Sequence, residues 1–241
     1  MSDVQLRHVG APPAAQRVLV IGAHPDDPEF FCAGAIARWI AAGTIVHYVL
    51  VTSGDKGLPE DWTDPRPFVT VRENEQLAAA EELGVQGVTF LRLPDGEVFD
   101  TLDLRAQLTA EIRRFRPDIV LTHDPLTRLY RQHPDHRAVG AAALAAAFPA
   151  SRLATFFPEQ REAGLGPHSV RIALLFGTDR PDTFIDIAPV FERKLAALRR
   201  HASQASAFPG GLETRVRTRA REAGAPAGLE LAEAFLWVDL E

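Results

Sequence analysis

The chain has 241 residues, of which 46% are hydrophobic, and this length is sufficient for one α/β domain with a full core. Its formal net charge of -6 gives no general attraction to nucleic acid or to an anionic membrane surface, so neither is expected as a partner. Cys32 is the only cysteine, which excludes a disulfide within the chain and fits a reducing compartment.

Apolar runs alternate with helical patterns along much of the chain. Strands are expected at residues 18–23, 45–52, 88–91, 118–122, 171–176, 183–186 and 234–239. Helices are expected at residues 32–42, 68–83, 102–115, 135–148, 189–201 and 215–222. Residues 53–67 are rich in glycine and proline, so they are expected to form a loop, and a lid over a site is one role open to it.

This alternation predicts an α/β fold, a Rossmann-like three-layer sandwich in which helices cover both faces of a mainly parallel sheet. The first five strands are expected in the order 3-2-1-4-5, which places strands 1 and 4 side by side where the order reverses. Ligands of such sheets bind at this reversal, outside the carboxyl ends of the strands. We interpret residues 1–241 as a single domain, with residues 1–16 as a flexible N-terminal extension.

Two clusters of histidine and aspartate follow strands 1 and 4, namely His24-Pro25-Asp26-Asp27 and His133-Pro134-Asp135-His136. Either cluster alone is more typical of an ordinary turn or of a helix start, with Asp135 as the N-cap. The predicted strand order brings both clusters to one crevice. Together they therefore indicate a mononuclear metal site.

A catalytic zinc ion takes three protein ligands and leaves its fourth position for water. His24, Asp27 and His136 are the expected ligands, and iron or cobalt could occupy the same set. Asp26 is the expected general base, which takes a proton from the metal-bound water. If it is protonated, His133 is expected to stabilise a tetrahedral oxyanion or to protonate a leaving amine.

These motifs resemble those of the LmbE-like (PIG-L) family of zinc-dependent deacetylases, which remove N-acetyl groups, mostly from amino sugars. The likeness covers nearly the whole chain and includes Ala23-His24-Pro25-Asp26-Asp27, Arg72-Glu73-Asn74-Glu75, Leu93-Pro94-Asp95-Gly96, His133-Pro134-Asp135-His136, Lys194 to His201-Ala202-Ser203-Gln204, and Ala232-Glu233-Ala234-Phe235. The resemblance implies the same zinc ligands, the same general base and the same role for His133.

The chain departs from the family pattern at three places. Pro28 stands where the family usually has glutamate, and Glu29 follows one residue later, either as a support of the site or as a first-turn acid favoured by the helix dipole. Only Gly34 remains of the family's glycine pair at the helix start. Arg131 takes the place of a substrate-facing tyrosine with Tyr130 one residue earlier, and the sequence leaves open which of them replaces it.

Four residues are expected to contact substrate: Arg72, Asp95, Arg131 and His201. Plainer interpretations remain for three of them, as a surface ion pair of Arg72 with Glu75, a turn residue at Asp95 and a helix cap at His201. Three acids are expected to support the metal ligands: Glu29, Asp124 and Asp135. Asp124 would brace a metal-binding imidazole, or it is simply a loop residue before proline.

The leading interpretation is a zinc-dependent hydrolase that removes an N-acetyl or other N-acyl group from an amino sugar or glucosaminide. Two alternatives fit the same fold, a thiol-conjugate amidase acting on a mycothiol-like adduct and a catalytically silent sugar-binding relative. Dinucleotide binding is disfavoured, because the first turn lacks Gly-x-Gly-x-x-Gly and places carboxylates where a pyrophosphate would lie. The sequence identifies neither the sugar nor the pathway.

Residues 1–16 lack the basic region and hydrophobic stretch of a signal peptide. The longest apolar runs, at residues 18–23 and 138–148, are shorter than the roughly 20 residues that a membrane-spanning helix needs. We therefore expect a cytoplasmic protein whose partner is a small N-acylated amino sugar or glycoconjugate. A homo-oligomer is compatible with the sequence.

Overall fold

The computed structural model describes residues 6–58, 64–127, 132–205 and 211–241. Within these ranges the strands are β1 (His8–Gly10), β2 (Arg17–Gly22), β3 (Ile45–Thr52), β4 (Gly87–Leu93), β5 (Ile119–His123), β6 (Ile172–Phe176), β7 (Thr183–Asp186) and β8 (Ala232–Asp239). The α-helices are α1 (Asp27–Ala41), α2 (Pro65–Leu83), α3 (Leu102–Phe115), α4 (Pro134–Ala145), α5 (Pro158–Glu162), α6 (Phe191–Arg199), α7 (Ala202–Ala205) and α8 (Leu212–Gly224). Short turns of other helix types occur at Ala146–Ala150, Ala188–Val190 and Ala225–Ala227.

The described strands form one sheet in the order β1-β7-β8-β6-β5-β2-β3-β4. β4, β3, β2, β5 and β6 run parallel to one another. β8 pairs antiparallel with both β6 and β7, and β1 extends the sheet beyond β7. β4-β3-β2-β5-β6 has the order expected for the first five strands, but β8, β7 and β1 continue the sheet. The sheet is therefore mixed, not mainly parallel, and its full order differs from 3-2-1-4-5. The difference arises because β8, the last strand of the chain, lies between β6 and β7. Apolar periodicity predicts that a segment is a strand, but it does not predict which distant strand pairs with it.

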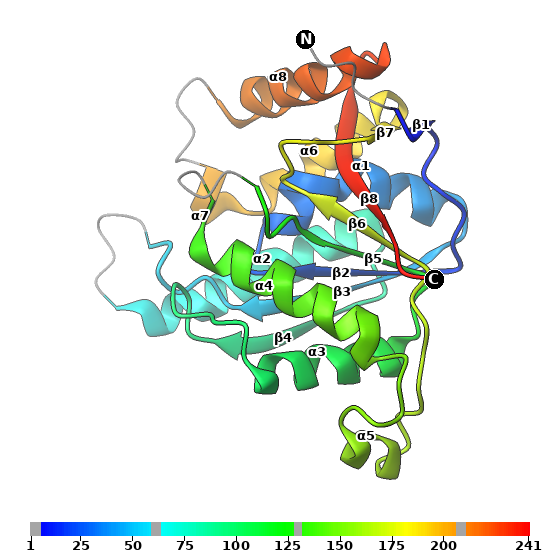
Figure 1. Ribbon diagram of the computed structural model, residues 1–241. Helices are drawn as coiled ribbons and strands as arrows, with labels where there is room; N and C mark the ends of the chain where they lie inside the picture. The colour runs from blue at the N-terminus through cyan, green and yellow to red at the C-terminus, as the bar shows by residue number, and fades with distance from the viewer. Residues whose placement is uncertain (1–5, 59–63, 128–131, 206–210) are drawn as a thin grey trace.

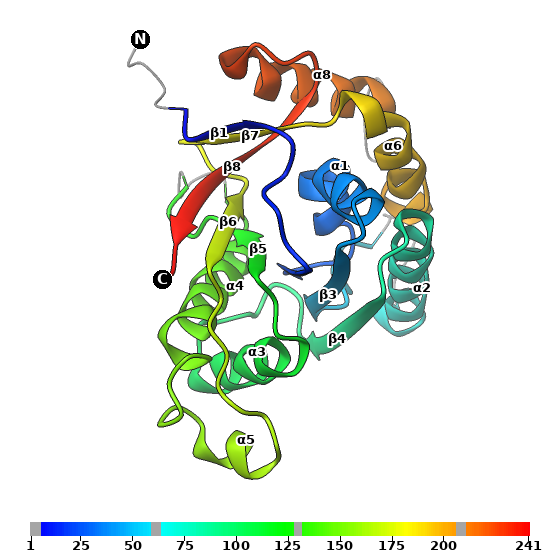
Figure 2. The same ribbon diagram turned by 90° about the vertical axis from the view of Figure 1, so that its right-hand side faces the viewer.

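Helices cover both faces of the sheet, as the three-layer prediction required (Figures 1 and 2). α1, α2, α6 and α8 contribute to the core on one face, and α3 and α4 contribute to the core on the other. β2 serves both cores by alternation, because Val18 and Val20 face the first and Leu19 and Ile21 face the second. No helix in the described ranges is long and apolar enough to cross a membrane.

Residues 6–16 pack against the body of the protein, which corrects the expectation of a flexible extension for this part of the chain. β1 pairs with β7, and the indole of Trp39 donates a hydrogen bond to the carbonyl of Pro13 at 2.8 Å. Thr44 Oγ1 donates to the carbonyl of Ala15, also at 2.8 Å. The side chains that bind this segment belong to residues distant in sequence. Its own composition therefore does not predict that it packs in a fixed position. Residues 1–5 lie outside the described ranges.

The predicted elements match the structure best where the sequence carries its own boundary signal. α3 coincides with the predicted helix at residues 102–115, and the Thr101 side chain caps it by accepting from Leu104 N at 3.2 Å. α1 begins five residues before the predicted start, and α2 begins within the predicted loop at residues 53–67. Residues 59–63 of that loop lie outside the described ranges, so a lid role stays a prediction.

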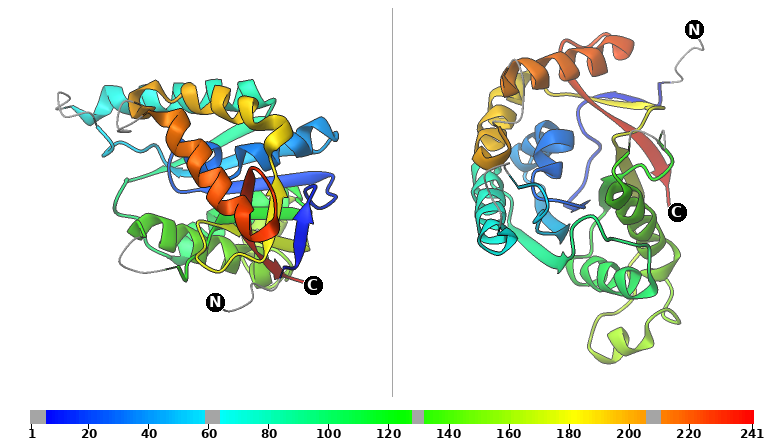
Figure 3. Two further views of the ribbon diagram at one scale, coloured as in Figure 1. Left: turned by 90° about the horizontal axis from the view of Figure 1, so that it is seen from above. Right: turned by 90° about the vertical axis from the view of Figure 1, so that its left-hand side faces the viewer.

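The order of the strands brings two chain segments together at one edge of the sheet. β2 pairs directly with β5, and the segments that follow them lead into α1 and α4. Figure 3, right, shows these two helices on opposite sides of the sheet. The two histidine and aspartate clusters lie where each connection enters its helix, and they include the first residues of α1 and α4.

Candidate metal centre and catalytic cavity

The turn between β2 and α1 is closed by the side chain of Asp27. Its Oδ2 atom accepts hydrogen bonds from the backbone N–H groups of Ala23 at 2.9 Å and His24 at 2.8 Å. Asp26 has a left-handed backbone with φ of 90°, and Pro28 follows in the first turn of α1. This strained turn holds His24 and Asp27 at the carboxyl end of β2.

The three predicted ligands, His24, Asp27 and His136, lie close together. His136 Nε2 lies 3.3 Å from His24 Nδ1 and 3.2 Å from Asp27 Oδ1. His24 Nδ1 lies 3.7 Å from Asp27 Oδ2. Two imidazole nitrogens and one carboxylate oxygen around a common point form a donor set suited to a borderline-soft divalent metal ion.

A second grouping of side chains, His24 with Asp95 and His133, also brings ligand atoms within 4.8 Å of one another. The hydrogen bonds of His24 distinguish the two groups. Its Nε2 lies 3.1 Å from Asp95 Oδ1 and 3.3 Å from Asp135 Oδ2, so carboxylates surround that nitrogen. A proton on Nε2 leaves the lone pair of Nδ1 facing Asp27 and His136. Carboxylates that fix the outer nitrogen of a ligating histidine in this way are a usual feature of metal sites.

The charges around His24 favour a cation. Burial on its own lowers the pKa of His24, but the hydrogen bonds that it donates to Asp135 and Asp95 and the charge of Asp27 outweigh burial and raise that pKa to about 10. Burial likewise raises the pKa of Asp27, and the adjacent imidazoles of His136 and His123 reverse this and hold it well below its usual value. The same field that stabilises an imidazolium stabilises a bound metal ion.

The partly buried Asp26 pairs with the buried Arg72 beside the three candidate ligands. Arg72 Nη2 donates to Asp26 Oδ2 at 3.1 Å and to the carbonyl of Pro25 at 2.5 Å. Arg72 is only 3% exposed, so it is not a surface partner of Glu75, whose carboxylate instead accepts from Ser203. Burial raises the pKa of the Asp26 carboxyl to about 6, although the charge of Arg72 acts in the opposite direction.

Glu29 lies beneath this pair and is fully buried. It accepts from Gln76 Nε2 and pairs with His201 Nε2, each at 3.0 Å, while Gln76 Oε1 accepts from Asp26 N at 2.9 Å. His201 is 1% exposed, so the structure places it behind Asp26 and corrects the expectation that it contacts substrate directly. Burial lowers the pKa of His201, but the Glu29 carboxylate outweighs this, so the net pKa is raised.

His133 is exposed at the start of α4. Its Nδ1 accepts a hydrogen bond from the backbone N–H of Asp135 at 3.2 Å, which makes it the N-cap residue. Burial, followed by repulsion from His24 and His136, lowers the pKa of His133. The neutral ring therefore carries its proton on Nε2, where it can act as a hydrogen-bond donor.

A cavity of about 370 Å³ opens onto these groups. It is lined by His24, Asp26, Asp27, Gly54, Lys56, Gly57, Arg72, Asp95, Gly96, His133, His136 and Gln204. Asp95 Oδ2 accepts from Lys56 N at 2.9 Å, and its Oδ1 lies 3.1 Å from His24 Nε2. A contact between Asp95 and substrate stays a prediction. Arg131 and Tyr130 lie outside the described residues, so the choice between them stays open.

The supporting acids are placed differently from one another. The Asp135 carboxylate contacts His24 and accepts from Gly96 N at 2.7 Å and Val98 N at 3.3 Å, so its position is compatible with a supporting role. Asp124 does not match its expected one. Its carboxylate accepts from Thr178 Oγ1 at 2.7 Å and from Leu126 N at 2.9 Å, which makes it an organiser of the loop after β5.

His123, the last residue of β5, is a site residue that the sequence did not predict. It is 2% exposed, and its Nε2 lies 3.1 Å from Asp27 Oδ2. Burial and the adjacent His136 lower the pKa of His123 to about 4. The available signal was weak, because His123 is a lone histidine at the end of an apolar strand and belongs to no motif.

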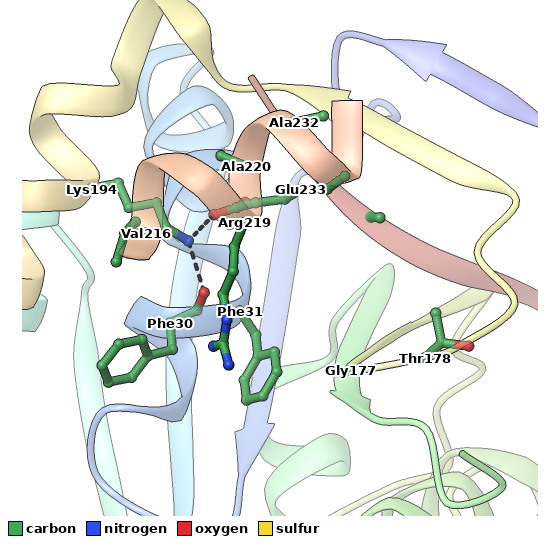
Figure 4. Close-up of a pocket in the computed structure, with 12 residues that line it drawn as sticks. Phe30, Phe31, Gly177, Thr178, Lys194, Val216, Arg219, Ala220, Ala232 and Glu233 are labelled. Atoms are coloured by element: carbon green, nitrogen blue, oxygen red, sulfur yellow. Dashed lines mark hydrogen bonds and ion pairs between the residues drawn. The ribbon is translucent and has the colours of Figure 1, made fainter. Parts of the chain in front are cut away.

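A second cavity of about 330 Å³ lies behind Phe31, between α1, α8 and the loop after β6 (Figure 4). The Phe31 ring forms part of its wall and packs edge-on against His136, with ring centroids 6.2 Å apart. Lys194 and Glu233 form a buried ion pair at 2.6 Å in the same wall, and Lys194 also donates to the carbonyl of Phe30 at 2.9 Å. This cavity is separate in its lining from the catalytic one.

Comparison with known proteins places this arrangement among deacetylases. A curated relative, diacetylchitobiose deacetylase of Thermococcus kodakarensis, is 35% identical, with 92% of this chain and 83% of the relative covered. The crystal structure of N,N'-diacetylchitobiose deacetylase from Pyrococcus horikoshii superposes with a TM-score of 0.87 at 32% identity, covering 93% of this chain and 84% of that one. A 4-carboxy-2-hydroxymuconate hydratase of Pseudomonas putida shares the fold at 26% identity and a TM-score of 0.78, over 92% of this chain and 96% of that one.

The family profile described as PIG-L, GlcNAc-PI de-N-acetylase, matches residues 19–147. This range contains both histidine and aspartate clusters and the helix that carries Arg72. The chain belongs to the PIG-L family of deacetylases.

Proposed function

We propose that this protein is a metal-dependent hydrolase that removes the N-acetyl group from an amino sugar or glucosaminide. The observation that carries the proposal is the convergence of His24, Asp27 and His136 beside the partly buried carboxyl of Asp26, in a cavity of about 370 Å³. Deacetylase relatives that act on acetylated glucosamine units support the substrate class.

The residues present fit a metal ion by the chemistry of their donor atoms. Asp27 Oδ1 and His136 Nε2 approach to 3.2 Å, and carboxylates surround the opposite nitrogen of His24. His24, Asp27 and His136 would hold the ion, and the His₂Asp set favours zinc, with iron or cobalt as substitutes. A bound divalent ion supplies Lewis acidity, which polarises the acyl carbonyl and lowers the pKa of water.

The chain's own residues move the protons. Asp26 takes a proton from the water that attacks the acyl carbon, and Arg72 holds the carboxylate in place at 3.1 Å. The neutral His133 donates a hydrogen bond from Nε2 to the oxyanion of the tetrahedral intermediate. When the C–N bond breaks, protonated Asp26 returns its proton to the leaving amine, and acetate and the free amino sugar are the products.

The remaining polar groups of the cavity would bind the sugar. Lys56, Asp95 and Gln204 lie at its wall and offer donors and acceptors to hydroxyl groups. Arg72 uses its guanidinium on Asp26 and Pro25, so we assign it to orienting the base. Arg131 stays a proposed substrate contact.

The experiment is release of acetate from a panel of N-acetylglucosaminides by zinc-loaded protein, with N-hexanoyl analogues and a mycothiol-like conjugate in parallel. The proposal predicts release of acetate and of free amine in equal amounts. Cleavage of only the larger conjugate would identify a thiol-conjugate amidase instead. Zinc and sugar binding without turnover would identify a sugar-binding relative, and hydration of an unsaturated carboxylic acid would point to the chemistry of the hydratase with this fold.

A further inference from the structure

We infer that His123 is a positioning residue that sets the geometry of the metal site through two ligands at once, Asp27 by a hydrogen bond and His136 by ring stacking. This inference rests on the metal-binding part of the proposed function. It gives a role to a buried imidazole that the chemistry proposed above does not use.

The hydrogen bond determines which oxygen of Asp27 faces the ion. Asp27 Oδ2 receives the N–H groups of Ala23 at 2.9 Å, His24 at 2.8 Å and His123 at 3.1 Å. With three donors, that oxygen is saturated. The other oxygen, Oδ1, is left for the ion and lies 3.2 Å from the Nε2 atom of His136.

The direction of the hydrogen bond follows from the neighbouring backbone. Ala23 N lies 3.4 Å from His123 Nε2, but this N–H already donates to Asp27 Oδ2 at the shorter distance of 2.9 Å. The Nε2 of His123 is therefore the donor and Asp27 the acceptor. The bond is the same whether the imidazole carries one proton or two, so its role does not depend on the titration of His123.

Stacking determines the orientation of His136. The rings of His123 and His136 lie face to face, with centroids 3.8 Å apart and planes at 18°. Phe176 and Phe31 pack edge-on against His123, with ring centroids at 4.6 Å and 5.6 Å, and prevent it from turning. A rigid imidazole thus supports the face of the ligand.

The two rings can stack because α4 lies close to the end of β5. Gly140 lies one turn beyond His136 in α4, and a Cβ atom there would be 2.4 Å from the carbonyl oxygen of His123. The helix can therefore lie close to the end of β5 only because residue 140 is glycine. Together, Gly140 and the β2–β5 pairing bring Asp27, His123 and His136 into one contact set.

The test measures Zn²⁺ affinity by competition with a chromophoric chelator and records the visible spectrum of the Co²⁺-loaded protein. Two variants separate the contacts, since His123→Phe keeps a stacking ring without the donor and His123→Gln keeps a donor without the ring. We expect Zn²⁺ binding to weaken by about 10- to 100-fold in His123→Phe, with a changed Co²⁺ spectrum in both variants. His47→Gln is the matched control, because His47 is a half-buried histidine bonded to Thr89 at 2.9 Å and outside the site.

Wild-type affinity and an unchanged Co²⁺ spectrum in both variants, with only a lower melting temperature, would overturn the inference and leave His123 as a core residue. If His123→Phe does not fold, the spectrum and affinity of His123→Gln decide. Substrate is not needed for these readouts. Absence of acetate release would therefore count against the proposed reaction alone, and absence of Zn²⁺ binding by the wild type would count against the metal site itself.

Discussion

Asp26 and Asp27 are adjacent in sequence, yet the structure gives their carboxyl groups opposite properties. Burial acts on both and favours the protonated form. At Asp27, His136 and His123 outweigh it, so the pKa lies well below the usual value and suits a metal ligand. At Asp26, burial prevails over Arg72 and raises the pKa to about 6, which suits a group that takes up and returns a proton.

Replacement of the base tests this division. Asp26→Asn keeps the shape of the side chain but cannot accept a proton, so we expect kcat for acetate release to fall by about 10²- to 10⁴-fold. Zn²⁺ affinity should change little, because Asp26 is not among the proposed ligands. The exposed Asp103→Asn in the first turn of α3 serves as the control. A kcat within threefold of wild type would remove Asp26 from its proposed role.

His201 predicts a pH dependence of stability. Its pKa is raised above the unfolded value of about 6.5, because Glu29 and Asp26 outweigh burial and Arg72. The stabilisation is therefore complete below pH 6.5 and declines as the pH rises towards the folded pKa. In urea unfolding of metal-free protein, the wild type should lose more unfolding free energy between pH 6 and pH 8 than His201→Gln does. Parallel pH profiles for the two proteins would contradict the pairing.

At the residue scale, the sequence indicated the three candidate ligands more clearly than the residues that surround them. His24, Asp27 and His136 occur in short motifs with a recognisable pattern, and the structure brings them together. For Arg72, the plainer interpretation was a surface ion pair with Glu75. Helical spacing shows that these two residues are neighbours, but it does not show that Arg72 is buried. His123 was missed because a lone histidine at a strand end carries no motif.

At the scale of elements, one ion pair joins three of them beside the site. Lys194 on α6 binds Glu233 on β8 at 2.6 Å, and Glu233 also accepts from Gly34 N at 2.9 Å and Ala35 N at 2.7 Å within α1. A Cβ atom on Gly34 would lie 2.4 Å from Ile187 Cγ2, which explains why this glycine of the family pair is kept. The helix that begins with the catalytic turn is thus fixed to the C-terminal strand.

Removal of the lysine should be costly. Lys194→Met leaves the buried Glu233 carboxylate without its countercharge, and we expect a loss of about 3–5 kcal/mol in unfolding free energy, measured in urea. The double variant Lys194→Met/Glu233→Gln should be more stable than Lys194→Met alone. Arg199→Met breaks an exposed pair with Glu213 of similar length, 3.0 Å, and should cost less than about 1 kcal/mol. Equal losses for the buried and the exposed pair would contradict this account.

The elements themselves were predictable where a pattern is local. The Thr101 cap and apolar periodicity marked α3, and the strands next to the site followed from continuous apolar runs. The position of β8 between β6 and β7 was not predictable, because an antiparallel return has no sequence signal of its own. The ordered packing of residues 6–16 was not predictable either, because the residues that they contact are distant in sequence.

At the scale of the whole molecule, the fold limits the reaction types that the protein could catalyse, but it does not determine which of them it catalyses. Deacetylases and a hydratase share this architecture with the chain. What distinguishes the reaction is the site, in which the three candidate ligands His24, Asp27 and His136 and the partly buried Asp26 face one cavity. The single-domain interpretation of residues 1–241 stays a prediction.

The most direct measurement is a titration of metal-free protein with Zn²⁺, in which acetate release from an N-acetylglucosaminide is followed at each step. The account predicts no release without metal, a rise in proportion to added Zn²⁺ and a plateau at one ion per chain. His136→Ala should show neither the rise nor tight binding. Equal acetate release by the metal-free and the zinc-loaded protein would contradict the central claim.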